Sequence, residues 1–264
     1  MINVISFPKL NLSFEINRTA ITIGGFSVYW YGILIALGIV LALCYAYFEC
    51  KRTGFDSEHI FNMLLIALPV AIICARAYYV IFNFNLYRGN LAGIFNIRGG
   101  GLAIYGGIIG IVIVILAYCR RTKINIGTVL DILAIGLLIG QAIGRWGNFV
   151  NGEAFGGPTT LPWAMSIKND GKMIADMVHP TFLYESLWNT VGIFVLLCYK
   201  KIKSFDGELF CGYMIWYGIG RALIEGLRAD SLYLGIFRVS QLLSISLFIV
   251  GLTLIIYKRY IRKG

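Results

Sequence analysis

Long apolar runs follow one another along the chain from residue 28 to residue 257, separated by short polar stretches. Each run is close to the length of about 20 residues that a helix needs to cross a lipid bilayer. Lipid offers the backbone no hydrogen-bond partners, so such segments cross as helices that pair their own N–H and C=O groups. The pattern predicts seven transmembrane helices, at residues 28–47, 60–82, 102–118, 126–150, 182–199, 209–227 and 237–257.

The polar stretches between the runs predict the remaining parts of the fold. Alternating apolar and polar residues in LNLSFEIN and TAITI indicate a hairpin or arm within residues 1–27, lying on the membrane before the first helix. Two longer stretches, 83–101 and 151–179, are long enough to form small structures outside the membrane. We expect an all-α integral membrane protein, a single polytopic domain over residues 1–264. It would be a seven-transmembrane-helix bundle with a small extracytoplasmic head and an N-terminal arm.

The charges give this bundle an orientation. The chain is 58% hydrophobic and 14% charged, with a net charge of +10. Its cations cluster after alternate helices, and such clusters mark the cytoplasmic side, which places the N-terminus outside and the C-terminus inside. No basic segment is interleaved with stacking aromatic residues, so we expect contact with anionic lipid headgroups and no nucleic-acid partner. The clusters are Lys51 and Arg52; Arg120, Arg121 and Lys123; Lys200, Lys201 and Lys203; and Lys258, Arg259, Arg262 and Lys263.

Cysteine and histidine give no sign of a metal site. The six cysteines are dispersed, without a CxxC pair or a nearby histidine, and are typical of small apolar packing residues. We therefore expect neither a metal nor an organic cofactor.

Polar residues inside the predicted helices gather toward the outer side. On the fourth helix, Gln141, Arg145 and Asn148 lie within about 60° of one another around the helix axis. The polar group continues past the end of that helix with Asn151 and Glu153.

The sixth predicted helix carries a second polar face. Tyr217, Arg221, Glu225 and Arg228 stay within about 80° around the axis. Further polar residues occupy the outer parts of the first three helices, so five helices present polar groups to one layer. These further residues are Tyr29, Tyr31, Arg76, Tyr79 and Tyr105.

Each of these features also has a purely structural interpretation. Tyr31 and its neighbours fit an interfacial aromatic belt, and Arg221 with Glu225 fits an internal ion pair. Gly106 and Gly110 fit a helix–helix contact, and Asp131 fits a solvated or capping role. The polar residues of these helices, taken together, are harder to explain by structural roles alone. At least two arginines with only one buried acid partner would leave positive charge unneutralised, and ionisable groups at membrane depth are functional by default.

An excess of arginine facing the outer leaflet has a chemical complement in phosphate, because the guanidinium fork matches phosphate oxygens bidentately. A phosphate at this depth belongs to a phospholipid headgroup. Asn148, Asn151, Tyr31 and Tyr217 would then donate hydrogen bonds to its oxygens, and Glu153 or Glu225 would orient an arginine or handle a proton.

Several motifs give the chain a specific resemblance. The stretch GRWGNFVNGEAFG, residues 144–156, resembles the signature of the bacterial prolipoprotein diacylglyceryl transferases. Other pieces agree in order along nearly the whole chain. They are Trp30-Tyr31-Gly32, Arg76 with Tyr79, the Gly-Gly tract at the third helix, His179-Pro180 with Tyr184-Glu185, and Tyr217-Gly-x-x-Arg221-x-x-x-Glu225-x-x-Arg228.

The resemblance implies an activity and its partners. Enzymes of that family move the diacylglyceryl group of phosphatidylglycerol onto the lipobox cysteine of an exported prolipoprotein, forming a thioether and releasing glycerol phosphate. It implies a bacterial plasma membrane location, a periplasmic or extracellular head and a site toward the outer leaflet. We expect Arg145 and Arg221 to clamp the phosphate, with Tyr105 and Glu153 as further catalytic residues. The expected substrate-binding residues are Tyr31, Arg76, Asn148, Asn151, Tyr217, Glu225 and Arg228.

One position departs from the family pattern. Many members carry a histidine before the Gly-Gly pair of the third helix, whereas this chain has Tyr105, and a neutral tyrosine cannot accept a proton. Of the two histidines, His59 falls at the cytoplasmic start of the second helix, and His179 lies outside, before Pro180. A structural role for His179 is favoured over a role as the base, and the general base stays open.

Two other classes of protein remain as alternatives. An anion or lipid transporter with an Arg-lined site would carry polar groups through both halves of the membrane and usually internal repeats, which the sequence does not show. A seven-helix receptor would not require the arginine-rich layer.

Overall fold

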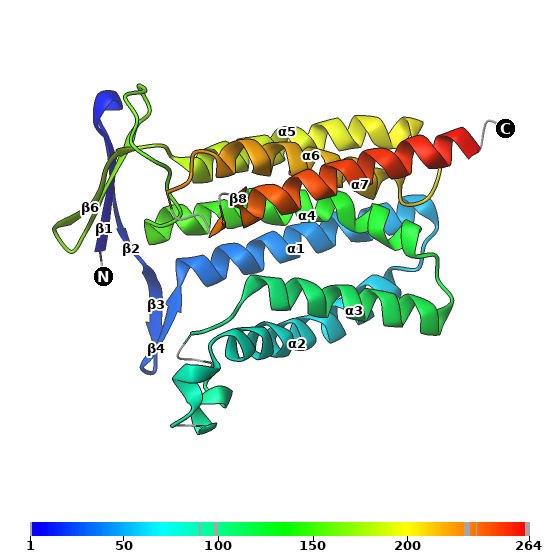
Figure 1. Cartoon of the computed structure of the whole chain (residues 1–264), viewed down its shortest axis with the longest axis horizontal. Helices are drawn as coiled ribbons and strands as arrows, with labels where there is room; N and C mark the ends of the chain where they lie inside the picture. The colour runs from blue at the N-terminus through cyan, green and yellow to red at the C-terminus, as the bar shows by residue number, and fades with distance from the viewer. Residues whose placement is uncertain (1, 90, 98–99, 230–232, 236, 262–264) are drawn as a thin grey trace. The chain divides into compact units, whose positions relative to one another are not determined.

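The protein is described by a computed structural model that covers residues 2–261 apart from 90, 98–99, 230–232 and 236. Seven long α-helices run through these described residues, joined by short connections and small strands (Figure 1). Their bounds are α1 Trp30–Thr53, α2 Ser57–Phe82, α3 Ile104–Thr122, α4 Ile126–Asn151, α5 Thr181–Tyr199, α6 Glu208–Glu225 and α7 Val239–Ile261. Short 3-10 turns lie at Pro8–Leu10, Phe84–Tyr87, Leu91–Phe95 and Lys200–Ile202.

Each predicted helix has a counterpart, but six of the seven, within the described residues, are long and apolar enough to cross a membrane. The one outside this group is α6, which has 18 residues and carries the polar face predicted from the sequence. The protein is therefore a mostly helical membrane protein, and the seventh span stays a prediction. Arg262 and Lys263 of the last basic cluster lie outside the described residues, as do parts of the 83–101 loop.

The head predicted around residues 151–179 contains a four-stranded sheet in the order β2-β1-β5-β6. Its strands are β1 Ile2–Phe7, β2 Leu12–Asn17, β5 Met165–Asn169 and β6 Lys172–Val178, all antiparallel to their neighbours. A second hairpin pairs β3 Thr19–Ile23 with β4 Phe26–Tyr29, and β7 Tyr233–Leu234 pairs with β8 Phe237–Arg238. The all-α expectation is corrected to this extent: the N-terminal arm joins the head through β1 and β5.

Alternation along β1 explains how the sheet is held. Ile5 and Phe7 point to one face, as residues two apart in a strand must, and they are buried with Met165, Ile167 and Phe182 in one apolar core. Since Phe182 lies in the first turn of α5, this core fixes the sheet to the helix that follows it.

The chain divides into two compact units, which are described separately. Unit 1 comprises Met1–Ala46 and Leu130–Gly264, and unit 2 comprises Tyr47–Val129. In unit 2, α3 packs on α2 at its glycines, because a side chain on Gly106 would overlap Cys74 and Ala75. The predicted helix–helix contact of Gly106 and Gly110 is thus confirmed.

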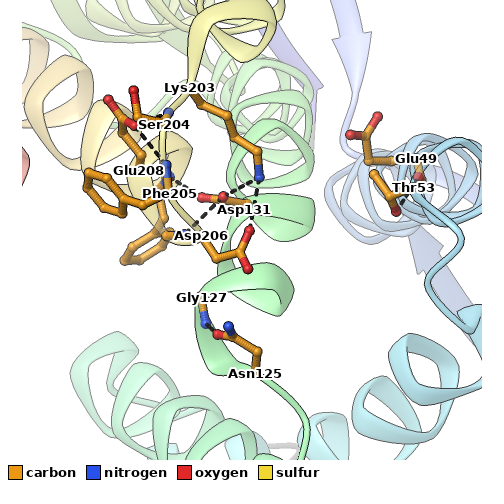
Figure 2. Close-up of polar contacts among 12 residues, drawn as sticks. Glu49, Thr53, Asn125, Gly127, Asp131, Lys203, Ser204, Phe205, Asp206 and Glu208 are labelled. Carbon is orange, nitrogen blue, oxygen red and sulfur yellow. Dashed lines mark hydrogen bonds and ion pairs between the residues drawn. The ribbon is translucent and has the colours of Figure 1, made fainter. Parts of the chain in front are cut away.

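In unit 1, two buried carboxylates hold the beginning of α6. Asp131, on α4, accepts hydrogen bonds from the backbone N–H of Gly207 and Phe210 at 2.9 and 3.0 Å and from Lys203 at 2.9 Å (Figure 2). Asp131 therefore caps a neighbouring helix and is buried, so the solvated alternative is wrong. Burial lowers the pKa of Lys203, but the hydrogen bond and charge of Asp131 outweigh this effect and leave the pKa above its ordinary value.

Glu208 is the second of these carboxylates and is fully buried. It accepts hydrogen bonds from the hydroxyl of Tyr199 at 2.7 Å, from Arg259 at 2.6 Å and from the backbone of residues 204–205 (Figure 2 shows this last connection). The last turns of α5 and α7 are thereby tied to the first turn of α6.

Candidate active site

The polar end of α4 is closed by a compact turn. Gly152 adopts a φ of +62°, which favours glycine, and Ile167 and Asn3 press against it. The turn brings Glu153 back so that one carboxylate oxygen accepts from the side-chain amides of Asn148 at 3.0 Å and Asn151 at 3.2 Å. These three predicted site residues therefore form one hydrogen-bonded group.

Arg145 links this group to a buried ionic cluster. One guanidinium nitrogen of Arg145 lies 3.4 Å from the side-chain oxygen of Asn148, and another lies 2.5 Å from a carboxylate oxygen of Glu185. Glu185 comes from the second turn of α5 and is 5% exposed. Arg221 of α6 approaches the second oxygen of Glu185 at 2.8 Å, so this carboxylate lies between two arginines from two other helices.

A second carboxylate completes the cluster. Glu225 is 1% exposed and lies 2.6 Å from Arg221, one helical turn away on α6. Arg228 follows the end of α6, where its guanidinium lies 3.7 Å from Glu185 and 4.0 Å from Glu225. The predicted polar face therefore continues beyond the helix itself, through a turn that aims Arg228 back at the cluster.

We call Arg145, Glu185, Arg221, Glu225 and Arg228 the arginine–glutamate cluster. Three guanidinium groups and two carboxylates leave one formal positive charge in a partly desolvated place. The expectation of a single buried acid partner is wrong, since Glu185 is a second one, but the positive excess remains. Such a cluster is chemically suited to an anion that accepts several N–H bonds at once.

Aromatic residues border the cluster in unit 1. The ring of Tyr31 on α1 packs onto Gly147 of α4, where an added Cβ would lie 2.6 Å from the ring. The ring of Tyr217, one helical turn before Arg221 on α6, stacks on that of Tyr213 with centroids 5.8 Å apart. Gln141 donates to the hydroxyl of Tyr213 at 2.7 Å, which adds a contact between α4 and α6 below the cluster.

The segment after Glu153 lies between His179 and Leu227 and is hydrogen-bonded to both. Gly156 and Gly157 exchange backbone hydrogen bonds with His179 at 2.9 and 3.0 Å, and Gly157 donates to Leu227 at 2.8 Å. A Cβ on Gly156 would lie 2.7 Å from His179 and 2.8 Å from Leu227. Glycine is therefore the residue that lets this strand pass next to the turn carrying Arg228.

His179 has contacts of a structural kind. Its imidazole Nδ1 lies 3.2 Å from the hydroxyl of Tyr184, which also accepts from Trp163 at 2.7 Å. The structural interpretation of His179, which the sequence favours, stays a prediction.

Two predicted site residues, Arg76 and Tyr105, belong to unit 2 and are described there. The buried guanidinium of Arg76 donates to the carbonyl oxygens of Gly93, Ile94, Gly100 and Gly101 at 2.7 to 2.9 Å. It thus organises the loop between α2 and α3. The ring of Tyr105 lies 6.4 Å from that of Tyr78. Their predicted substrate-binding and catalytic roles stay predictions.

Glu185 is a site residue that the helical period of the sequence does not predict. A glutamate inside the apolar run of the fifth helix is costly in hydrocarbon unless it is paired, so its position indicates that it has a partner. Periodicity places residues on one helix face, but the pairing with arginines on two other helices depends on how the helices pack. Among the described residues, no group of three or more His, Cys, Asp or Glu side chains is arranged to hold a metal ion.

The described part of the chain contains six membrane-length apolar helices and a buried arginine–glutamate cluster at the polar end of α4. These features define an integral membrane protein with an ionic site. The chain belongs to the prolipoprotein diacylglyceryl transferase family, whose family model matches residues 18–257. It is therefore a bacterial membrane enzyme of the transferase class.

Similar proteins named phosphatidylglycerol–prolipoprotein diacylglyceryl transferase agree along nearly their whole length. One from Finegoldia magna is 50% identical over 251 residues, covering 94% of this chain and 98% of its own. One from Clostridioides difficile is 47% identical, covering 91% of this chain and 95% of its own. One from Bacillus cereus is 45% identical, covering 93% of each.

Proposed function

We propose that the arginine–glutamate cluster binds the phosphate of phosphatidylglycerol during transfer. As a member of its family, the protein transfers the diacylglyceryl group of phosphatidylglycerol to the cysteine thiol of prolipoproteins. The observation that carries the assignment is the position of Glu185 between Arg145 and Arg221, with Arg228 nearby. The two carboxylates orient the guanidinium groups, and the five side chains together carry one net positive charge that attracts the phosphate.

The reaction needs a nucleophile and a stabilised leaving group. A thiol with a pKa of about 8.5 is partly ionised near neutral pH, so the attacking thiolate forms by loss of its proton to water. Its sulfur forms a bond to the glyceryl carbon while the bond between that carbon and the phosphate oxygen breaks. The electron pair leaves with glycerol phosphate, and fixed guanidinium donors in a water-poor site stabilise the charge that grows there.

The neighbouring amides and tyrosines give the lipid its orientation in this proposal. Asn148 and Asn151, held by Glu153, would donate to the glycerol and phosphate oxygens. Tyr31, packed on Gly147, and Tyr217, one helical turn before Arg221, would border the headgroup. The lipobox cysteine of the prolipoprotein signal peptide would approach from the side of the four-stranded sheet, since α4 ends beside it.

The orientation in the membrane follows from the basic clusters. We place the N-terminus and the sheet outside, the C-terminus in the cytoplasm and the arginine–glutamate cluster toward the outer leaflet. A lipid in that leaflet would then present its phosphate at the depth of the cluster, next to a preprotein arriving across the membrane.

The direct test is transfer by the purified protein in nanodiscs that contain phosphatidylglycerol. A short peptide with a lipobox cysteine should gain the mass of a diacylglyceryl group, and glycerol phosphate should appear in equal amount. The same peptide with serine in place of cysteine should gain nothing, because a neutral hydroxyl is a much weaker nucleophile.

Replacing Arg145 tests the role of the cluster itself. Arg145→Ala should lower turnover by about a hundredfold or more, as expected for removal of a preorganised charge donor. Arg145→Lys should recover little of it, because an ammonium group lacks the fork that reaches two acceptors. Near-normal turnover of either variant in folded form would exclude the phosphate assignment for Arg145.

A further inference from the structure

The helices α5 and α6 meet at a symmetric pair of tryptophans that the site does not contain. The indole rings of Trp188 and Trp216 stack with centroids 4.5 Å apart and an interplanar angle of 22°. The indole N–H of Trp188 donates to the backbone carbonyl of Trp216 at 3.0 Å, and that of Trp216 donates to the carbonyl of Trp188, also at 3.0 Å. Each ring thus binds the backbone of the opposite helix.

Two glycines make room for the rings. A side chain on Gly220 would overlap the indole of Trp188, and one on Gly192 would overlap the indole of Trp216. In both cases the glycine lies four residues, about one helical turn, after the tryptophan of its own helix. Trp188, Gly192, Trp216 and Gly220 therefore form one reciprocal contact, which we call the tryptophan clasp.

The clasp lies directly beside the arginine–glutamate cluster along both helices. Glu185 precedes Trp188 by three residues on α5, and Arg221 follows Gly220 on α6. The two helices run in opposite directions, so the clasp and the pair of Glu185 and Arg221 are consecutive contacts along one seam. The position of the rings therefore fixes which residue of α6 lies opposite Glu185.

Such a contact matters because apolar packing alone only weakly fixes the position of one membrane helix along the axis of its neighbour. Lipid tails are as apolar as the helix surfaces, so no hydrophobic force opposes a slip of one helix along the other. A slip by one residue moves a helix by about 1.5 Å, and a misplacement of about 1 Å can lower turnover a hundredfold. The two indole N–H bonds and the close packing of each ring on a glycine oppose this motion in both directions.

We propose that Trp188 and Trp216 are positioning residues that set the register of α5 against α6, and that they act on catalysis only through Glu185 and Arg221. The proposal rests on the function proposed above for the arginine–glutamate cluster.

The test compares Trp188→Leu, Trp216→Leu and the double variant with the wild-type protein in nanodiscs. Stacked indoles produce an exciton couplet in far-UV circular dichroism, which should be present in the wild type and lost in all three variants. The kcat for transfer should fall by about tenfold or more, because the displaced arginine no longer fits the transition state. The double variant should be no slower than the slower single variant, since either change opens the same contact.

The KM for phosphatidylglycerol should change by less than about threefold, because the displaced contact matters most in the transition state. Gly220→Ala should lower kcat in the same way, since its methyl group displaces Trp188. Gly140→Ala on α4 is the matched control, because an added Cβ there meets nothing within 4 Å, and it should keep both the couplet and kcat. Trp188→Phe and Trp216→Phe, which retain a ring but lose the N–H donor, replace the leucine variants if those do not insert, and each should also lower kcat.

Three results would overturn the proposal. They are a lost couplet with kcat within about twofold of the wild type, a double variant whose losses multiply, and a lower unfolding temperature with unchanged kcat. Wild-type protein with the couplet but no glycerol phosphate release would contradict the proposed function, and with it the positioning role. Active leucine variants beside an active wild type would contradict the positioning role alone.

Discussion

Glu185 illustrates how one side chain determines the chemistry of the site. With Arg145 at 2.5 Å and Arg221 at 2.8 Å, its two oxygens are used by two different helices. A buried carboxylate without these partners would be costly, and the arginines without Glu185 would repel one another. The side chain therefore orders the cluster even though its own charge opposes the binding of an anion.

We expect Glu185→Gln to lose transfer activity, by about a hundredfold, because the neutral amide would present an N–H to one of the two arginines. The protein should still insert, since the change is nearly isosteric. Turnover with labelled phosphatidylglycerol measures the effect, and Asn189→Ala, a change on the same helix, provides a control for destabilisation of α5. A glutamine variant with wild-type turnover would show that the arginines keep their geometry without this carboxylate.

The sequence could predict the residues of the site that share one helix. Arg145 with Asn148, and Arg221 with Glu225, follow from the helical period together with their cost in lipid, and the structure brings each pair together. Glu185 could not be assigned from this reasoning, because its partners lie on α4 and α6 and only packing brings them together. The resemblance of Tyr184-Glu185 to the family motif is the sequence feature that points to this residue.

At the scale of single elements, the first turn of α6 depends on polar groups from other helices. Asp131 accepts hydrogen bonds from backbone N–H groups at this turn, and Glu208 joins the turn to α5 and α7. This helix of 18 residues, which carries a polar face, is thus fixed at its first turn by polar contacts that burial in lipid does not provide.

Asp131→Asn should destabilise the protein by about 2 kcal/mol, because one of the two capping N–H groups would face an amide N–H. In the wild type, the raised pKa of Lys203 implies stabilisation that is present below the unfolded pKa of about 10.4 and is lost as the pH rises through the folded value. Thermal unfolding between pH 8 and pH 11 measures both effects. If the unfolding temperature of wild type and variant fell in parallel above pH 10, the coupling of Lys203 to Asp131 would be wrong.

Gly156→Ala should separate the 154–157 segment from the turn that carries Arg228. The added methyl group lies within 2.8 Å of both His179 and Leu227, so one of these strands has to move. We expect a loss of transfer of about tenfold or more and faster proteolysis of the 151–179 loop, both measurable on the purified protein. Gly157→Ala, whose Cβ would meet Leu227 only at 3.9 Å, is the matched control. Equal effects of the two changes would contradict the close-passage argument.

The elements themselves were largely predictable. Apolar length located all seven helices to within a few residues, as in α4, where 126–150 was expected and Ile126–Asn151 is found. The strands beyond the arm were not anticipated, because β5 and β6 lie in a loop whose pairing with β1 is a long-range contact. Short alternating segments indicate strands, but they do not indicate their partners.

At the scale of the whole molecule, the basic clusters predict the orientation in the membrane. A single cysteine introduced at Asp170 in the β5–β6 turn should react with a membrane-impermeant maleimide added to intact cells, and one at Lys201 should react only after the cells are opened. The test uses a background in which the exposed Cys44 and Cys198 are replaced by serine. The reverse pattern would place the arginine–glutamate cluster at the inner leaflet.

The pairing of β1 with β5 also has a consequence for how the protein is made. Ser6 lies opposite Ser166, so β1 waits for its partner β5 while α1 to α4 are synthesised and inserted. At typical rates of translation, this interval is roughly ten to thirty seconds. During it, β1 can pair with β2 along one edge, but its other edge has no partner, and Ile5 and Phe7 lack the part of their core that Met165, Ile167 and Phe182 supply. An open strand edge is prone to aggregation. We therefore expect the edge of β1 that pairs with β5 to be covered by lipid or by another protein during synthesis.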